Sequence, residues 1–170
     1  MRLLACMLFT VAIAGCGGGS AGPTSPSLPA NVAGTWNGTS TSTVTAGPAC
    51  LDRQPTTGPA MVQIAQSGAA ISGTFANCSF HGTVSDTTIS WTQDAQQADL
   101  LCRLAHPLFC ISSGGIEIIF VSAKASSIVG TVSGTQISAS GSSTDDIVDP
   151  ATGQAIGTVQ FALRLSLQRR

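Results

Sequence analysis

The stretch GTVSDTTIS at residues 82–90 returns later in the chain as GTVSGTQIS at residues 130–138. Each copy has the pattern of a strand, a two-residue turn and a second strand. With Asp86-Thr87 or Gly134-Thr135 as the turn, the apolar residues on either side lie opposite each other. The facing pairs are Val84 with Ile89, and Val132 with Ile137. The repeat therefore predicts antiparallel hairpins with one buried face.

A Gly-Thr-apolar tripeptide occurs five times, with its apolar residue at Trp36, Phe75, Val84, Val132 and Val159. Glycine inside a strand weakens that strand unless the sheet bends or coils there. Its recurrence on several strands predicts a sheet that curls onto itself, and closure of such a sheet removes the unpaired edges. We therefore expect an all-β fold, an antiparallel up-and-down meander barrel of eight to ten strands.

The composition agrees with short strands and tight turns. Only 9% of the 170 residues are charged and 19 are glycine, and no stretch has the spacing and end signals of a long helix. Nine strands are expected. Besides the repeat they cover about residues 33–45, 60–66, 69–76, 115–123 and 159–168, with a loop over about 141–153. A closed meander needs an even number, so part of 103–112 is a strand, one of the nine is wrong, or the sheet is open.

The N-terminus has the layout of a secretory signal, because Arg2 precedes an apolar run that is too short to span a bilayer stably. The run ends in Ile13-Ala14-Gly15-Cys16, which resembles the lipobox of bacterial lipoproteins. Ile13 stands where Leu is usual, Ala14 and Gly15 are the small residues, and Cys16 matches the lipidated thiol. The resemblance implies a signal peptide at residues 1–15 and acyl chains on Cys16. The alternative is an ordinary secretory signal cut near Ala14 or Gly15.

Residues 16–32 are expected to be the lipidated cysteine and a flexible, disordered tether, because glycine and serine precede an extended proline-containing half. Residues 33–170 then form a single β-barrel domain. Gly17 is not the Asp that retains many lipoproteins at the inner membrane, so the resemblance implies the outer membrane, facing the periplasm or the outside.

The start of the domain, Gly34-Thr35-Trp36, together with the Gly-Thr hairpins resembles the avidin and lipocalin type of small meander barrel. In those families a Gly-x-Trp opens the first strand, and the Trp plugs one end of the barrel. The resemblance implies that role for Trp36. It does not extend to a biotin site, because the chain has no Tyr and only Trp36 and Trp91.

Export makes disulfides the default for the cysteines that follow the signal, Cys50, Cys78, Cys102 and Cys110. In a meander the connections that hold the first three leave the barrel at the same end. We therefore expect Cys50 to pair with Cys78 and Cys102 with Cys110. The alternative pairs Cys50 with Cys102 and Cys78 with Cys110.

The rim that these bridges tie together is the expected ligand-binding region, because barrel mouths are common ligand sites. The charged residues near it are Asp52, Arg53, Asp99, Arg103 and His106. No metal ion is expected: Cys102, His106 and Cys110 lack a fourth zinc ligand. Asp145, Asp146 and Asp149 lack the glycine and spacing of a calcium loop.

The sequence predicts a non-enzymatic lipoprotein of the cell envelope that binds a small apolar molecule or a partner protein, with no cofactor and no nucleic acid. The alternative is a structural or interaction module without a pocket, in which a partner or the long loop covers strand 115–123. A hydrolase is disfavoured, because His81 has no Gly-x-Ser-x-Gly element to support a triad. An even number of strands with small interior residues would favour ligand binding, and a core filled by Phe75, Trp91, Phe120 and Phe161 would favour the alternative.

Overall fold

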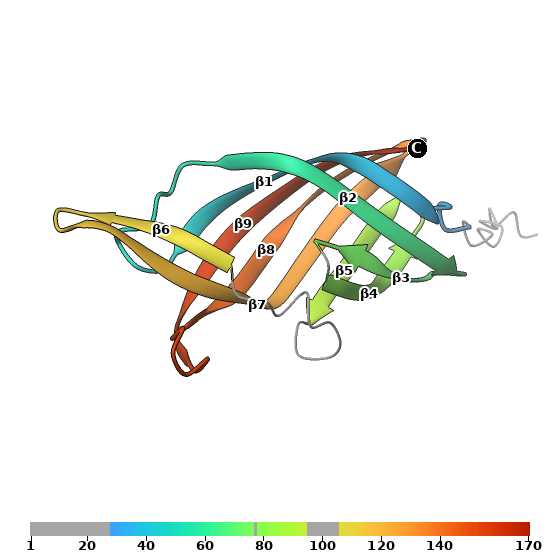
Figure 1. The fold of residues 1–170 in the computed structure, drawn as a ribbon. Helices are drawn as coiled ribbons and strands as arrows, with labels where there is room; N and C mark the ends of the chain where they lie inside the picture. Colours follow the sequence, from blue (N-terminus) through green and yellow to red (C-terminus); the bar gives the residue numbers. More distant parts are fainter. Residues whose placement is uncertain (1–27, 77, 95–105) are drawn as a thin grey trace, which may run out of the picture.

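The computed structural model describes residues 28–76, 78–94 and 106–170. This part of the chain forms nine antiparallel β-strands and no helix, so it contains no helix that could cross a membrane. The strands are β1 (Gly34–Ala46), β2 (Thr56–Ser67), β3 (Ala70–Phe75), β4 (Cys78–Ser85), β5 (Thr88–Asp94), β6 (His106–Ser112), β7 (Gly115–Ser133), β8 (Gln136–Val148) and β9 (Ala155–Arg169). Figure 1 shows them wound around one interior.

Eight of these strands close a ring, in the order β5-β4-β3-β2-β1-β9-β8-β7, because β5 pairs with β7. The ninth, β6, pairs with the earlier part of the same β7 edge. Asp94 of β5 lies opposite Ala125, and His106 of β6 lies opposite Val121. The expected all-β meander barrel is confirmed, and its odd number of strands is explained because β5 and β6 share one position beside β7.

Both copies of the sequence repeat form the expected hairpins. Val84 lies opposite Ile89 and Val132 opposite Ile137, and all four side chains are buried. One expected strand boundary is wrong: the first strand of the second copy is continuous with the expected strand 115–123, and together they make the 19-residue β7. β8 pairs with one edge of this strand from Phe120 onward, and β6 and β5 pair with successive parts of the other edge.

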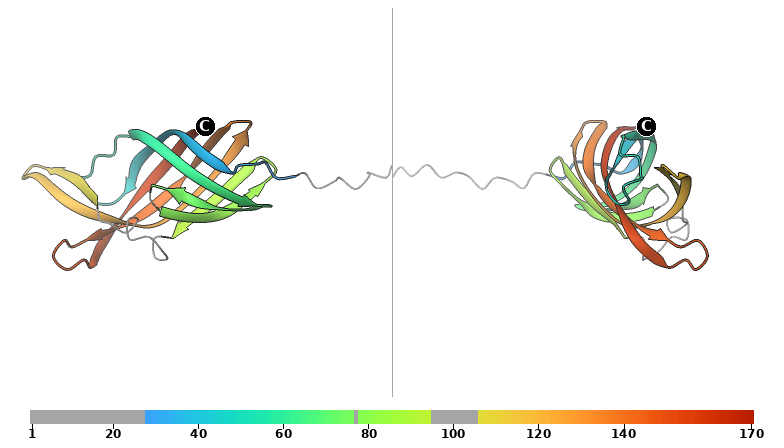
Figure 2. Two further views of the ribbon diagram at one scale, coloured as in Figure 1. Left: turned by 45° about the vertical axis from the view of Figure 1, so that its right-hand side comes forward. Right: turned by 90° about the vertical axis from the view of Figure 1, so that its left-hand side faces the viewer.

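The expected loop over 141–153 is also largely strand. β8 continues to Val148 and only residues 149–154 form the turn before β9. Serine and aspartate have low strand propensity, but pairing with β7 and β9 on both sides outweighs it here. These long strands form a tall wall, whereas β3, β4 and β5 form a short one (Figure 2).

The two ends of the barrel differ. We call the end with the β2–β3, β4–β5 and β7–β8 turns the closed end; residues 28–33 and the C-terminus lie there (Figure 1). The other end, with the 47–55 connection and the β6–β7 and β8–β9 turns, is the open end. The β6–β7 hairpin projects from the open end, on the far side of the molecule from residue 28 (Figures 1 and 2).

Glycines on the inner face allow the sheet to curl as expected. A Cβ added at any of five of them would lie less than 3 Å from atoms of the neighbouring strand, so a side chain there would force the strands apart. These positions are Gly38, Gly73, Gly82, Gly130 and Gly141. Three of them belong to the Gly-Thr-apolar tripeptides, whose apolar residues are all buried.

Trp36 is completely buried at the closed end, as the expected plug would be. Its indole Nε1 donates a hydrogen bond to the Val32 carbonyl at 2.8 Å, and the Arg169 guanidinium lies 4.8 Å from its ring centroid. Arg169 also donates to the Asn31 carbonyl. The segment before β1 is therefore held against the closed end.

The expected boundary between tether and barrel at residue 33 is wrong by a few residues. Val32 is completely buried, and the Ala30 amide donates to the Asp86 carbonyl at 2.8 Å. Gln66 also fixes this segment, because its side chain accepts from the Val32 amide and donates to the Ala30 carbonyl. Residues 30–32 thus pack with the barrel, and residues 16–27 of the expected tether lie outside the described residues.

Candidate ligand-binding site

The closed half of the barrel is filled by one apolar core that includes Trp36, Phe75, Phe80 and Trp91. The inner face of the open half is different. Strand alternation from Trp36 places Ser40, Ser42 and Val44 on the inner face of β1, yet all three remain partly exposed. Partly exposed positions continue on the inner face of the neighbouring β9, at Phe161 and Leu163.

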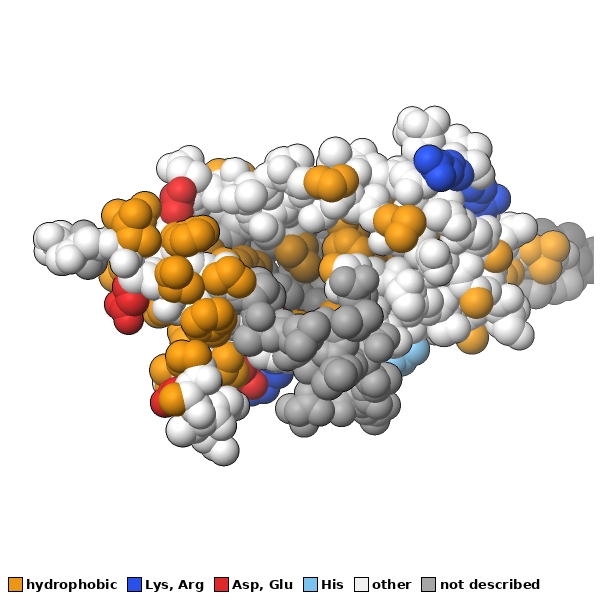
Figure 3. All heavy atoms as spheres, viewed as in Figure 1, with side chains coloured by type: hydrophobic (Ala, Val, Ile, Leu, Met, Phe, Trp, Pro, Cys, Tyr) orange, Lys and Arg blue, Asp and Glu red, His pale blue; other side chains and the backbone are white. Residues whose placement is uncertain are grey.

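Gly58 of β2 gives direct evidence for space inside the open half. It lies opposite Ser40 and two residues before the buried Ala60, so its missing side chain would point inward. A Cβ built there meets no atom within 4 Å. At Gly82, in the closed half, a Cβ would lie 2.0 Å from the Ser90 carbonyl oxygen. Figure 3 shows hydrophobic side chains in a recess near the middle of the barrel.

A polar layer separates the closed half from the open half. The buried polar side chains of the described residues are Gln93, Ser126 and Asp145. The Gln93 amide donates to the Phe75 carbonyl at 2.8 Å and to the Cys78 carbonyl at 3.3 Å, and it accepts from the Ser126 hydroxyl at 2.6 Å. Gln93 is therefore fully used in bracing β5 against β3, β4 and β7.

Trp91 lies next to this layer, two residues before Gln93 on the same inner face of β5. Its side chain is only 1% exposed, and its ring stacks at a tilt on Phe80 with centroids 5.3 Å apart. Its indole Nε1 has no hydrogen-bond partner among the residues that the structure describes. A buried donor without a partner costs about 1–3 kcal/mol. Because the indole is enclosed by the packed core of the closed half, this donor is not accessible from the open half.

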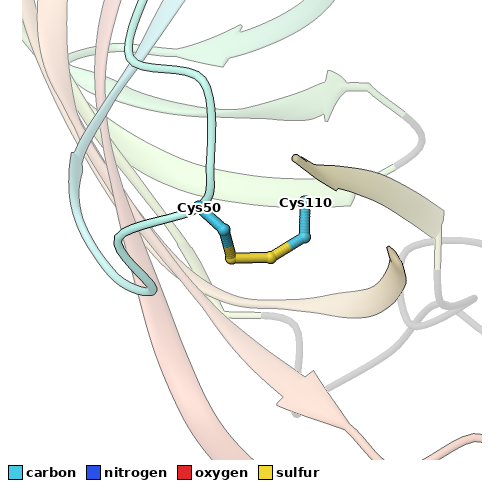
Figure 4. Close-up of a disulfide and its surroundings, with 2 residues drawn as sticks. All are labelled: Cys50 and Cys110. Atoms are coloured by element: carbon cyan, nitrogen blue, oxygen red, sulfur yellow. A yellow bond between two sulfur atoms is a disulfide. The ribbon is translucent and has the colours of Figure 1, made fainter. Parts of the chain in front are cut away.

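The wall of the open end is apolar and is closed by a disulfide. A second apolar cluster is built around Leu51, Val121, Ile147 and Val159. Cys50, in the connection between β1 and β2, is bonded to Cys110 of β6, with their Cα atoms 4.8 Å apart (Figure 4). The Ile111 amide donates to the Cys50 carbonyl at 3.0 Å. Leu51 and Cys110 form an isolated antiparallel β-bridge through their backbones.

This bond shows that both expected disulfide pairings are wrong, because each gave Cys50 and Cys110 other partners. The expected pairings assumed that all connections at this end of the barrel lie at the same height along the barrel axis, and this assumption was wrong. β2 carries residues 56–61 beyond its last pair with β3, Val62 opposite Phe75, which adds roughly 20 Å of strand. Cys78 sits near Phe75 at the lower level, and a disulfide requires Cα atoms within about 7 Å. Cys78 is disulfide-bonded as well, and Cys102 lies outside the described residues.

Two of the five expected ligand-binding residues can be placed, and neither faces the interior. Asp52 and Arg53 are exposed in the connection between β1 and β2. The Asp52 carboxylate accepts from the Gln54 amide at 2.9 Å, and the Arg53 guanidinium donates to the Thr45 carbonyl at 2.9 Å. Asp99, Arg103 and the side chain of His106 lie outside the described part of the structure. The interior residues were missed because small, uncharged side chains carry no sequence signal.

The candidates for metal or acid–base chemistry are not assembled. Cys110 is consumed by its disulfide and cannot serve as a zinc ligand. Asp145 is buried on the inner face, Asp146 pairs with Lys124 at 3.0 Å, and Asp149 accepts amides of its own turn. Exposed His81 shares a hydrogen bond of 3.2 Å with the Thr92 hydroxyl. No cluster of three or more His, Cys, Asp or Glu occurs among the residues that the structure describes.

Comparison of the chain with protein-family models, with curated proteins and with solved structures gave no match.

Proposed function

We propose that this protein is a lipid-anchored component of a bacterial cell envelope that binds a small, largely apolar molecule in the open half of its barrel, without catalysing a reaction. The observation that carries the proposal is the contrast between the two halves of one interior. A packed core fills the closed half, while Ser40, Ser42 and Leu163 on the inner face of the open half remain partly exposed near the empty space at Gly58. A barrel that needed only stability would gain from filling that space.

The lining indicates the chemical class of the ligand. Phe161, Leu163 and Val44 supply apolar surface, and Ser40 and Ser42 supply hydroxyl groups. Sites of this kind bind an apolar body and recognise a few polar groups on it. An apolar molecule with a hydroxyl or carbonyl group therefore fits better than a sugar or an ion.

A fluorescent apolar probe tests this proposal in the purified protein. We expect saturable binding of 1-aminoanthracene that a Gly58→Leu substitution weakens at least tenfold, because the new side chain occupies the space. The matched control is Thr57→Leu, the preceding residue on the outer face, which should bind like the wild type. Equal binding by both variants would place the probe elsewhere and contradict the proposal.

Native mass spectrometry of protein purified from its own envelope then addresses the natural ligand. A bound mass in the range of lipids or smaller, absent from Gly58→Leu, supports the proposal. Absence of any small molecule, together with no probe binding, would favour the alternative of an interaction module without a pocket. Phe75 and Trp91 lie in the packed core of the closed half, as that alternative expects, whereas Phe120 and Phe161 are only partly buried.

A further inference from the structure

The β6–β7 hairpin carries the largest gathering of exposed apolar side chains in the described structure. Five of the eight large hydrophobic side chains that are exposed lie on it or beside it. Figure 3 shows hydrophobic atoms collected over this end of the molecule. The exposed fractions are 61% for Phe109, 63% for Ile111, 71% for Ile116, 52% for Ile118 and 68% for Ile156 of β9.

Four of these residues lie on one side of the hairpin. Phe109 lies opposite Ile118 and Ile111 opposite Ile116, so two cross-strand pairs are stacked along the ribbon. Leu108, Cys110 and Ile119 alternate with them and point to the barrel interior, where they are at least partly buried. We call the four outward residues the apolar hairpin face. The next outward row continues it through Phe120, which pairs with Val148 of β8.

We propose that the apolar hairpin face is a contact surface for a second copy of this chain, in which the two hairpins stack face to face about a twofold axis. This inference is independent of ligand binding in the barrel. Two sheet faces of this kind pack about 10 Å apart with their side chains interdigitated. No charged residue lies on the face itself, so two copies meet without like-charge repulsion.

The area agrees with a modest dimer. The exposed parts of these side chains amount to on the order of 500 Å² in one copy, at the upper end of apolar patches on monomers. Two copies would bury roughly 1,000 Å², the lower limit of specific interfaces. Tethering to one membrane would raise the effective concentration of copies and favour such a contact.

A lipid bilayer fits the apolar hairpin face less well than a second copy of the chain does. Surfaces that lie on membranes carry Lys or Arg beside their apolar residues, but residues 106–123 and 147–163 contain neither. Glu117 and Asp149 make this end acidic instead. The face also lies at the open end, away from residue 28, where the anchored N-terminal segment joins the barrel (Figure 2). The proposed lipid anchor thus holds the closed end nearest its membrane.

Stacking of faces is favoured over pairing of strand edges. β8 begins to pair with β7 at Phe120. Residues 115–119 therefore pair only with β6, and their other edge has no partner among the described strands. If the free edges of two copies paired antiparallel, the Glu117 side chain of one copy would lie near Glu117 of the other. Two like charges on neighbouring strands destabilise such pairing. Glu117 thus discourages open-ended edge pairing while leaving the opposite face free for a closed dimer.

The test is sedimentation of the full-length chain with Cys16→Ala, which removes the lipid attachment, in buffer without detergent over a series up to several hundred micromolar. We expect a monomer–dimer equilibrium whose dissociation constant rises at least tenfold in Ile116→Thr/Ile118→Thr. Threonine keeps the β-branch. The matched control is Met61→Thr/Val129→Thr, because these side chains are 56% and 52% exposed elsewhere on the barrel. It should dimerise like the parent.

Thermal unfolding of each variant guards against a folding defect, and Phe109→Thr/Ile111→Thr provides a second pair if the first is damaged. A chain that stays monomeric throughout the series, or equal dimerisation of the face variant and the control, would overturn the proposal. So would a monomer that co-sediments with phosphatidylcholine vesicles and loses this binding in the face variant, because the occupant would then be lipid.

Discussion

Apart from Gly34 and Gly115, the first residues of β1 and β7, seven glycines have inner-face positions on the strands, and their surroundings separate two roles. At Gly82 a Cβ would lie 2.0 Å from the Ser90 carbonyl and 2.7 Å from the Trp91 Cα, so a side chain cannot be accommodated unless β4 and β5 move apart. At Gly58 the same atom meets nothing within 4 Å. The first glycine permits the curl of the sheet, and the second leaves space in the open half. The full set is Gly38, Gly58, Gly73, Gly82, Gly130, Gly141 and Gly157.

These roles predict opposite effects of one methyl group on stability. Gly82→Ala should lower the free energy of unfolding by about 2–4 kcal/mol, through overpacking and displacement of a paired strand. Gly58→Ala should leave it unchanged or raise it by about 0.5–1 kcal/mol, because alanine restricts the unfolded chain. Urea titration of both variants against the wild type measures the difference. Equal destabilisation would show that Gly58 is packed and that the open half is not hollow there.

Trp36 and Trp91 show how far single residues could be interpreted from sequence. Trp36 is buried in the core at the closed end of the barrel, where the Gly-Thr-Trp motif led us to expect it. Nothing in the sequence indicated that Arg169, far along the chain, would lie over its ring, because that contact depends on the pairing of β1 with β9. The unpaired Trp91 indole was likewise invisible, since burial without a partner is a property of the assembled interior.

At the scale of secondary-structure elements, strands and hairpins are predicted best where a local sequence pattern determines their register. Both hairpin repeats have the expected register, because a two-residue turn and apolar residues at fixed spacing determine it. Prediction failed where two elements share one partner. β5 and β6 both pair with β7, and no local signal marks a strand that passes from one neighbour to another. The unequal heights of the walls, which misled the cysteine pairing, follow from that same arrangement.

The Cys50–Cys110 disulfide leads to a specific prediction for the remaining cysteines. With Cys50 bonded to Cys110, the connectivity left for four cysteines is Cys78 with Cys102. It agrees with the topology, since Gln93 of β5 lies opposite Phe80 and the chain leaves β5 beside the start of β4, where Cys78 is buried. Peptide mapping without reduction should therefore recover a fragment joining Cys78 to Cys102 and another joining Cys50 to Cys110. A fragment joining Cys50 to Cys78 would contradict the structure.

At the scale of the whole molecule, the two ends of the barrel have different features. The closed end holds the packed core and receives the N-terminal segment through Ala30, Val32 and Arg169. The open end carries the partly exposed interior, the Cys50–Cys110 bridge and the apolar hairpin face. Because the chain enters at the closed end, a membrane anchor on that segment leaves the open end directed away from the attachment point and accessible to ligand or partner.

The proposed lipid anchor on Cys16 leads to a further prediction, and Cys6 provides the control. If Cys16 carries the acyl chains, Cys16→Ala should move the protein from the membrane fraction to the soluble fraction and abolish labelling by radioactive palmitate. Two or three acyl chains, at about 0.8 kcal/mol for each buried methylene, account for the retention of the wild type. Cys6→Ala changes the other N-terminal cysteine, which lies in the apolar core of the expected signal, and should alter neither readout. Retained labelling in Cys16→Ala, or a wild-type protein that is wholly soluble, would contradict the lipoprotein assignment while leaving the barrel and its interior unaffected.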